Sequence, residues 1–187
     1  MSGDQLGRYV FAWATANAVQ TVAYATVVVA AGPRLAKTAI NAPRQFTPTM
    51  RRAVLSVIAL TVLASVGIMS LCEPIFRLAH ESIDSTGLQV LGILLVSFVL
   101  RSVSDVLWVA AIARKEGRRV AAGMVALAAV GIPSTWWLIS RYAGIGVALA
   151  HLCSSLLITG WLAWVVRRAT HHADSRRRLQ TGDGRAA

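Results

Sequence analysis

Long apolar runs alternate with short polar segments along nearly all of this 187-residue chain. The runs cover residues 9–31, 53–72, 88–113, 120–139 and 142–166. Each has roughly the 17–25 residues that a helix needs to cross the hydrocarbon core of a bilayer. No run alternates apolar and polar positions with a period of two, and only helices or closed barrels satisfy the backbone in lipid. We therefore predict an all-α membrane protein in which residues 1–166 form a bundle of five transmembrane helices.

Basic residues lie mainly between the runs and on one side of this topology. Of the 19 lysines and arginines, 15 lie in residues 32–52, 114–119 and 167–187, three segments that a five-pass chain places on the same side. The others are Arg8, Arg77, Arg101 and Arg141. Because cytoplasmic loops are the basic ones, we predict an outside N-terminus, a cytoplasmic C-terminus and insertion in the inner (cytoplasmic) membrane. Residues 167–187 are expected to form a basic, disordered cytoplasmic tail.

The formal net charge of +11 would favour a nucleic-acid partner in a soluble chain. Here the basic loops of a membrane protein account for most of it, and no basic stretch carries interleaved aromatic residues, so we predict no binding of nucleic acid. The tail is expected to contact membrane lipids through anionic headgroups, each basic residue contributing about 1 kcal/mol. Alternatively, the tail is only a charged stop-transfer segment. The excess of arginine over lysine indicates a GC-rich bacterial genome.

Residues that could carry catalysis or hold a metal are sparse. Cys72 and Cys153 suggest neither a disulfide framework nor a zinc site. His171 and His172 lie in the tail without further ligands nearby. A Gly-x-Gly pair opens the last run, but no strand precedes it, which excludes a dinucleotide-binding fingerprint. We therefore predict that the chain is not an enzyme and has no catalytic residue, metal site or cofactor.

Arg101 is the most unfavourable residue for insertion, because it lies near the middle of the third run. An arginine at a helix centre costs about 2.5–3.5 kcal/mol on translocon scales. Asp105 follows one turn later on the same helix face and can pair with it. Ser97, Ser104 and Trp108 extend this stripe, which must face a water-filled cavity or another helix. Either Arg101 binds an anionic substrate, with Asp105 tuning it or carrying a proton, or the pair only fixes helix packing.

Two weaker polar stripes accompany the third run. The first run presents Trp13, Asn17, Gln20 and Tyr24 at helical spacing. The last run presents His151, Ser155 and Thr159. Asn17, Gln20 and Tyr24 are candidates for binding substrate, and His151 is a candidate for ion coupling together with Asp105. Polar residues of these types also often do no more than join neighbouring membrane helices by hydrogen bonds.

Short motifs mark the ends of several runs. They are AGPRLA after the first run, EPIFRL after the second, ARKEGRR after the third and YAGIGVALAHL at the start of the last. With these motifs, residues 9–166 resemble the C-terminal half of a polysaccharide flippase of the multidrug/oligosaccharidyl-lipid/polysaccharide exporter superfamily. The resemblance implies two packed six-helix lobes around a cationic cavity. It also implies a lipid-diphosphate-linked sugar as the substrate, which an ion gradient drives across the membrane.

The chain departs from that family in having five predicted helices where a lobe has six, and in having no N-terminal lobe. We therefore expect a partial lobe of a transporter, which needs a second membrane lobe or a homo-oligomer to enclose a path. Two alternatives are a non-transporting scaffold subunit of a polysaccharide-assembly complex and a non-functional truncated flippase. A longer reading frame, in which Met1 is an internal residue, would also account for the missing helices.

Overall fold

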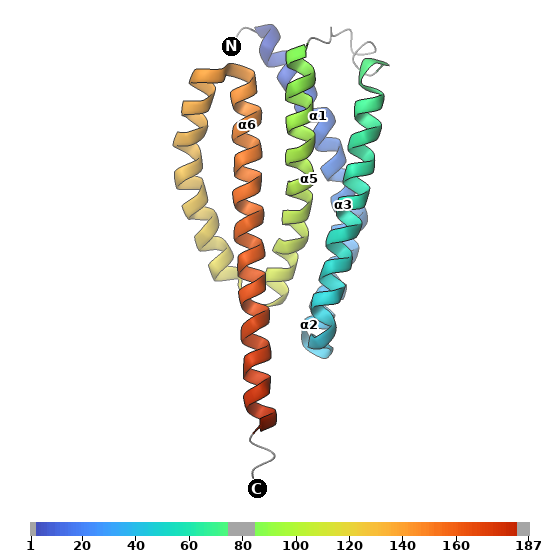
Figure 1. Ribbon diagram of the computed structural model, residues 1–187, viewed down its shortest axis with the longest axis vertical. Helices are drawn as coiled ribbons and strands as arrows, with labels where there is room; N and C mark the ends of the chain where they lie inside the picture. The colour runs from blue at the N-terminus through green and yellow to red at the C-terminus, as the bar shows by residue number, and fades with distance from the viewer. Residues whose placement is uncertain (1–2, 75–84, 183–187) are drawn as a thin grey trace.

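The structure, a computed structural model, describes residues 3–74 and 85–182, and within them the side chains of residue 7 and of residues 9–74 and 85–171. Nearly all of the described residues are helical, and none of them lies in a strand. The helices run side by side as one elongated bundle (Figure 1). The prediction of an all-α bundle is therefore confirmed for this part of the chain.

The helices follow one another in a simple order. They are α1 (Gly3–Ala23), the π-helical turn η1 (Tyr24–Val28), α2 (Val29–Asn41), the 3-10 turn η2 (Pro43–Gln45), α3 (Phe46–Ser70), α5 (Ser85–Ala113) and α6 (Gly117–Gly182). The first three continue into one another without a break and form a single long helix. The backbone of Ala143, with φ 47° and ψ −123°, folds α6 into two antiparallel arms, residues 117–142 and 144–182.

Four helical stretches are long and apolar enough to cross a membrane: Tyr9–Asn41, Pro43–Ser70, Ser85–Ala113 and Gly117–His171. The last of them contains both arms of α6, so the described residues supply five helical segments that run along the bundle. This agrees with the number that the sequence predicts. The ends of the chain lie at opposite ends of the bundle, as an odd number of passes requires (Figure 1).

Several helices extend beyond the predicted apolar runs, and two of the extensions contain a proline. The first helix continues ten residues beyond the predicted end at Ala31, through Pro33 to Asn41. Proline gives no N–H to the carbonyl four residues earlier, and the wider turn η1 lies immediately before that residue, Val29. Helix α3 starts at Phe46 instead of Ala53, with Pro48 in its first turn, where a missing N–H is tolerated.

The tail also differs from its prediction. Residues 167–187 were expected to be disordered, but α6 continues through this segment to Gly182. The physical reason is local: residues 167–180 contain neither glycine nor proline, and arginine, alanine, leucine and glutamine all favour helix. The end of α6 projects beyond the other helices, at the end of the bundle where the C-terminus lies (Figure 1).

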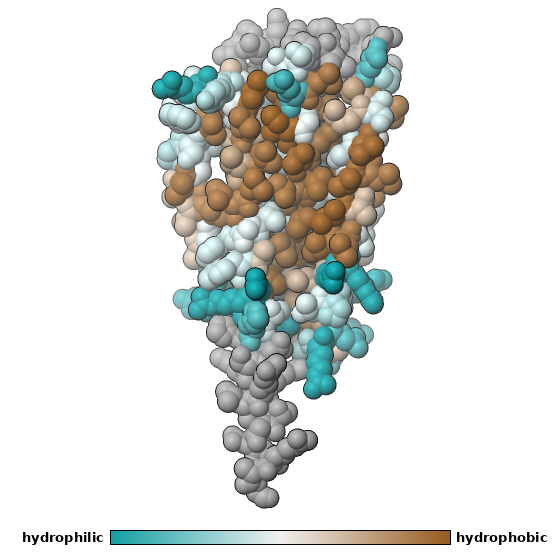
Figure 2. All heavy atoms as spheres, in the orientation of Figure 1, coloured by the Kyte–Doolittle hydropathy of each residue, from teal (hydrophilic) through white to brown (hydrophobic). Residues whose placement is uncertain are grey.

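Three basic segments gather at that same end, which we call the basic end. They are the α2–α3 connection, the α5–α6 connection and the last part of α6. Apolar residues form a broad belt across the middle of the molecule, and hydrophilic residues lie beyond it, mostly toward the basic end (Figure 2). The distribution is that of a multi-pass membrane protein, with charge concentrated on one side.

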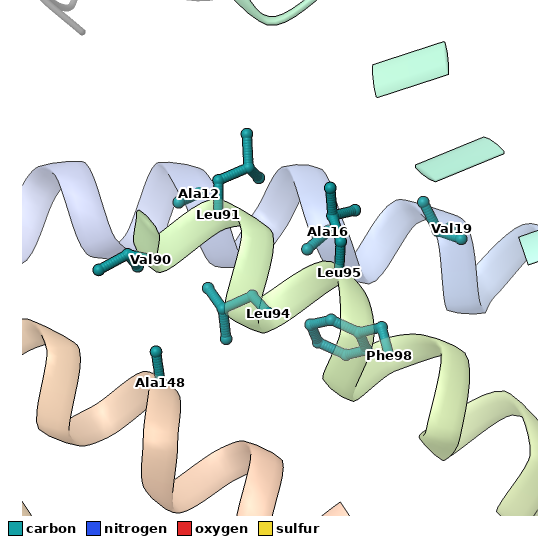
Figure 3. Packing of buried hydrophobic residues seen from close by; sticks show 9 residues of the cluster. All are labelled: Ala12, Ala16, Val19, Val90, Leu91, Leu94, Leu95, Phe98 and Ala148. Atoms are coloured by element: carbon teal, nitrogen blue, oxygen red, sulfur yellow. The ribbon is translucent and has the colours of Figure 1, made fainter. Parts of the chain in front are cut away.

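Helix α5 is the centre of the bundle and packs against α1, α2, α3 and α6. Its apolar residues form two large clusters with their neighbours, and Val106 belongs to a smaller third cluster with Ala23, Val28 and Val57. The N-terminal cluster consists of Ala12, Ala16, Val19, Val90, Leu91, Leu94, Leu95, Phe98 and Ala148, from α1, α5 and α6 (Figure 3). The basic-end cluster consists of Leu35, Phe46, Leu107, Ala110, Ala111, Val120, Leu162, Val165 and Val166. The stretch of α5 between the two clusters carries the polar residues.

Candidate polar site between the central helices

A polar level separates the two apolar clusters. On α5 it extends from Ser97, next to Phe98 of the N-terminal cluster, to Asp105, two residues before Leu107 of the basic-end cluster. We define the polar level by the residues that meet there: Gln20, Ser97, Arg101, Ser104, Asp105, His151, Ser155 and Thr159. These residues come from α1, α5 and the second arm of α6, so three helices build the site.

Hydroxyl groups join α5 to the second arm of α6. The Oγ atoms of Ser97 and Ser155 are 2.9 Å apart, and Ser97 Oγ also forms a short hydrogen bond with His151 Nδ1. Two turns after Ser97 on α5, Ser104 Oγ lies 2.7 Å from the Oγ1 atom of Thr159, which is one turn after Ser155 on α6. The two stripes that the sequence predicts on separate helices therefore face each other and bond in register.

A second contact joins α5 to α1. The Gln20 Nε2 amide donates to Asp105 Oδ2 at 2.8 Å, across 85 positions of the sequence. Of the two alternatives left open by the sequence, one paired Asp105 directly with Arg101, and this hydrogen bond gives the carboxylate a different partner. The spacing of four residues places both on one face, but the carboxylate bonds to the neighbouring helix instead. Gln20 is thus the residue of the first run that reaches the polar level.

Arg101 is half-buried at the centre of this level. Within the described side chains, its guanidinium forms no hydrogen bond and has no carboxylate within 4.0 Å. On α5 it lies one turn after Ser97, which bonds His151, and one turn before Asp105. An arginine so placed carries a large insertion cost without a direct ion pair to offset it. The site therefore presents a positive charge flanked by two titratable groups.

The other candidates of the first run lie elsewhere. Tyr24 is 49% exposed, in the turn η1, and faces away from the bundle interior. Asn17 is half-buried, and its side chain makes no hydrogen bond to the described residues. Trp13 packs edge-on against Phe98 with ring centroids 6.2 Å apart, beside the N-terminal cluster. The structure thus brings together Arg101, Asp105, His151 and Gln20, but not Asn17 or Tyr24.

Some of these contacts were signalled in the sequence and some were not. Ser97, Arg101 and Asp105 repeat every four residues, and so do His151, Ser155 and Thr159, a matched spacing that favours two facing helices. Nothing in the spacing of the first run signals that Gln20, of its four polar or aromatic members, meets Asp105. Which helix faces α5 at that point is decided by the tertiary packing of α1.

Among the described residues, no cluster of three or more histidine, cysteine or acidic side chains could hold a metal ion. Cys72 and Cys153 are both free thiols. That the chain is not an enzyme and uses no cofactor stays a prediction.

No family model, no curated protein and no solved structure matches this chain. The resemblance to the exporter superfamily therefore stays a prediction that depends on the short motifs alone.

Proposed function

We propose that this chain is a partial lobe of a transporter that moves lipid-diphosphate-linked oligosaccharide precursors across the bacterial cytoplasmic membrane. The observation that carries the proposal is Arg101: a cationic side chain halfway along the central helix, without a hydrogen-bonded carboxylate in the described residues. Charged side chains inside a membrane bundle commonly mark a substrate or ion pathway. The chain uses α5 to present this charge and two neighbouring helices to surround it with polar groups.

The chemistry of Arg101 fits a phosphate-bearing substrate. A guanidinium presents a planar fork of N–H donors that bonds two phosphate oxygens at once, and it stays charged at any physiological pH. The low dielectric of the bilayer strengthens such a contact. Asp105 and His151, which lie on either side of the arginine, are the groups that would exchange protons with an ion gradient. Binding of the anion would change the charge balance that both of them experience.

A second lobe is part of the proposal. The polar level is packed between α1, α5 and α6, and hydrogen bonds close it on two sides. A lipid-linked sugar is too large for such a space, so further helices must supply the remaining wall of a path. The first arm of α6 offers a surface for them, because Val125, Ile132 and Trp136 are 71%, 71% and 78% exposed. A second membrane protein or a second copy of this chain would supply those helices.

The test replaces Arg101 at the chromosomal locus. We expect Arg101→Gln to reduce surface polysaccharide at least tenfold, with normal amounts of the protein in the membrane, because the anion loses its counter-charge. Arg101→Lys should retain part of the activity, since a lysine keeps the charge but not the planar fork. Lipid-linked precursor should accumulate in the mutant and should be measured in the same cells.

Arg141→Gln is the matched control. It removes an arginine that is exposed at the opposite end of the bundle from the basic segments. We expect it to leave polysaccharide and precursor unchanged. Normal polysaccharide in the Arg101→Gln strain would exclude the proposed role of this residue.

A second candidate function is a non-transporting scaffold of a polysaccharide-assembly complex. The projecting end of α6 favours it, because a helix beyond the bundle gives partner proteins a surface outside the membrane. Deleting residues 172–187 would then impair polysaccharide assembly more than Arg101→Gln does. The transporter proposal requires the opposite order of severity.

A further inference from the structure

A groove lies between the two arms of α6 at the basic end, away from the polar level. Its volume is about 510 Å³, and Arg119, Gly123, Trp161 and Trp164 line it together with two alanines and a leucine of the first arm. Its walls are therefore apolar, apart from one arginine at the end nearest the α5–α6 connection. None of its residues belongs to the polar level.

The sequence builds this groove through a glycine and two tryptophans. A Cβ atom on Gly123 would lie 2.0 Å from Trp161 Nε1, so only glycine lets the indole ring lie directly against the first arm. Trp164 stacks on Trp161 with ring centroids 5.0 Å apart and ring planes 28° apart. The indole N–H of Trp161 is buried and has no hydrogen-bond partner among the side chains and backbone that the structure describes. The tryptophans thus form a flat, rigid wall.

Two arginine side chains lie beside the tryptophans of the groove. The side chain of Arg119 is 47% exposed, and its guanidinium forms an ion pair of 2.7 Å with Glu116. The Arg168 guanidinium lies over the Trp164 ring, 5.3 Å from the ring centroid. An arginine from each arm therefore borders the tryptophan wall.

We propose that this groove binds an anionic glycerophospholipid. Its phosphate would contact Arg119 and Arg168, and an acyl chain would lie along Trp161, Trp164 and the apolar side chains of the first arm. Three physical arguments favour this occupant. Basic pockets between transmembrane helices are complementary to anionic headgroups. Tryptophan concentrates at the level of the headgroups. Finally, the groove has a charged end next to an apolar wall, as a phospholipid has its phosphate next to its acyl chains.

The experiment uses the full chain in detergent micelles and native mass spectrometry. Phosphatidylglycerol and phosphatidylcholine of equal chain length are titrated separately against the wild-type protein and variants. We expect tighter binding of phosphatidylglycerol by the wild type, and a loss of about tenfold or more in the double variant Arg119→Gln, Arg168→Gln, at about 1 kcal/mol for each basic residue. Binding of phosphatidylcholine should change little.

The matched control is the double variant Arg51→Gln, Arg52→Gln. It removes the same amount of charge from the same end of the bundle, on exposed positions of α3. We expect it to retain the preference for phosphatidylglycerol. An equal loss in both double variants would show attraction to the whole basic end and would overturn the groove as a site. Equal affinity of the wild type for the two lipids would overturn it as well.

A second measurement does not depend on the arginine variants. Phosphatidylglycerol with brominated acyl chains quenches tryptophan fluorescence on contact. We expect it to quench the wild type more than brominated phosphatidylcholine does, and this difference should disappear in Trp161→Phe, Trp164→Phe. Persistence of the whole difference in that variant would place the lipid at other tryptophans and contradict the proposal.

Discussion

Two buried serines of the central helix differ in what their hydroxyl groups bond. Ser97 contacts His151 and Ser155 on a neighbouring helix, whereas Ser102 donates to the backbone carbonyl of Phe98, one turn earlier in its own helix. Both serines have no exposed surface. The difference separates a hydroxyl that holds two helices together from one that needs no partner helix.

We expect Ser97→Ala to lower the free energy of unfolding by about 1 kcal/mol, near the middle of the range measured for hydrogen bonds between membrane helices. The His151 and Ser155 side chains would both lose their partner in an apolar surrounding. Ser102→Ala should change stability by less than half as much. The measurement is unfolding in mixed micelles of mild detergent and dodecyl sulfate, and equal effects of the two substitutions would contradict the assignment.

Among the elements, the α6 hairpin depends on close approach of its arms at the fold-back. A Cβ atom on Gly146 would lie 2.2 Å from the backbone carbonyl oxygen of Leu138 on the other arm. That oxygen belongs to a helix and cannot move aside as a side chain can. By contrast, a Cβ atom on Gly131, within the first arm, would meet nothing within 4 Å.

Gly146→Ala is therefore expected to destabilise the protein by about 2 kcal/mol or more, because overpacking against backbone forces the arms apart. Gly131→Ala should be neutral or slightly stabilising, since alanine favours helix more than glycine does. Thermal unfolding of the purified protein, followed by circular dichroism, tests both. Similar unfolding temperatures for the two variants would show that the arms do not approach as closely as described.

On the scale of the whole molecule, charge is distributed along the long axis. Three basic segments lie at one end, and Arg141 lies at the other. Because basic loops stay cytoplasmic, this arrangement predicts that the basic end faces the cell interior. A fluorescent protein fused after Ala187 should fluoresce, and alkaline phosphatase fused at the same position should be inactive. The reverse pattern would invert the proposed orientation and place the lipid groove in the outer leaflet.

How much of this fold the sequence predicts depends on the range of the interactions concerned. The apolar runs predict five helical segments, because crossing lipid requires a local apolar composition that any window of residues shows. The helix ends at Asn41 and Gly182 were missed, because a helix satisfies its own backbone and can continue beyond the apolar region.

In the candidate site, too, local features were predictable and long-range contacts were not. The polar stripes were visible from their spacing, but their partners were not, because pairing is decided by how α1, α5 and α6 pack. The partner of Asp105 is the clearest case. The four-residue spacing allowed an ion pair with Arg101, but the carboxylate bonds Gln20, 85 positions away in the sequence.

The length of the second arm of α6 has a mechanical consequence. Residues 144–182 form one helix of about 58 Å at 1.5 Å per residue, about twice the thickness of a hydrocarbon core. Its tip at Gly182 lies 31 residues, or about 46 Å, beyond His151. A tilt of about ten degrees at the His151–Ser97 contact would therefore move the tip sideways by roughly 8 Å. A small rearrangement beside Arg101 would thus become a displacement that another molecule outside the membrane could sense.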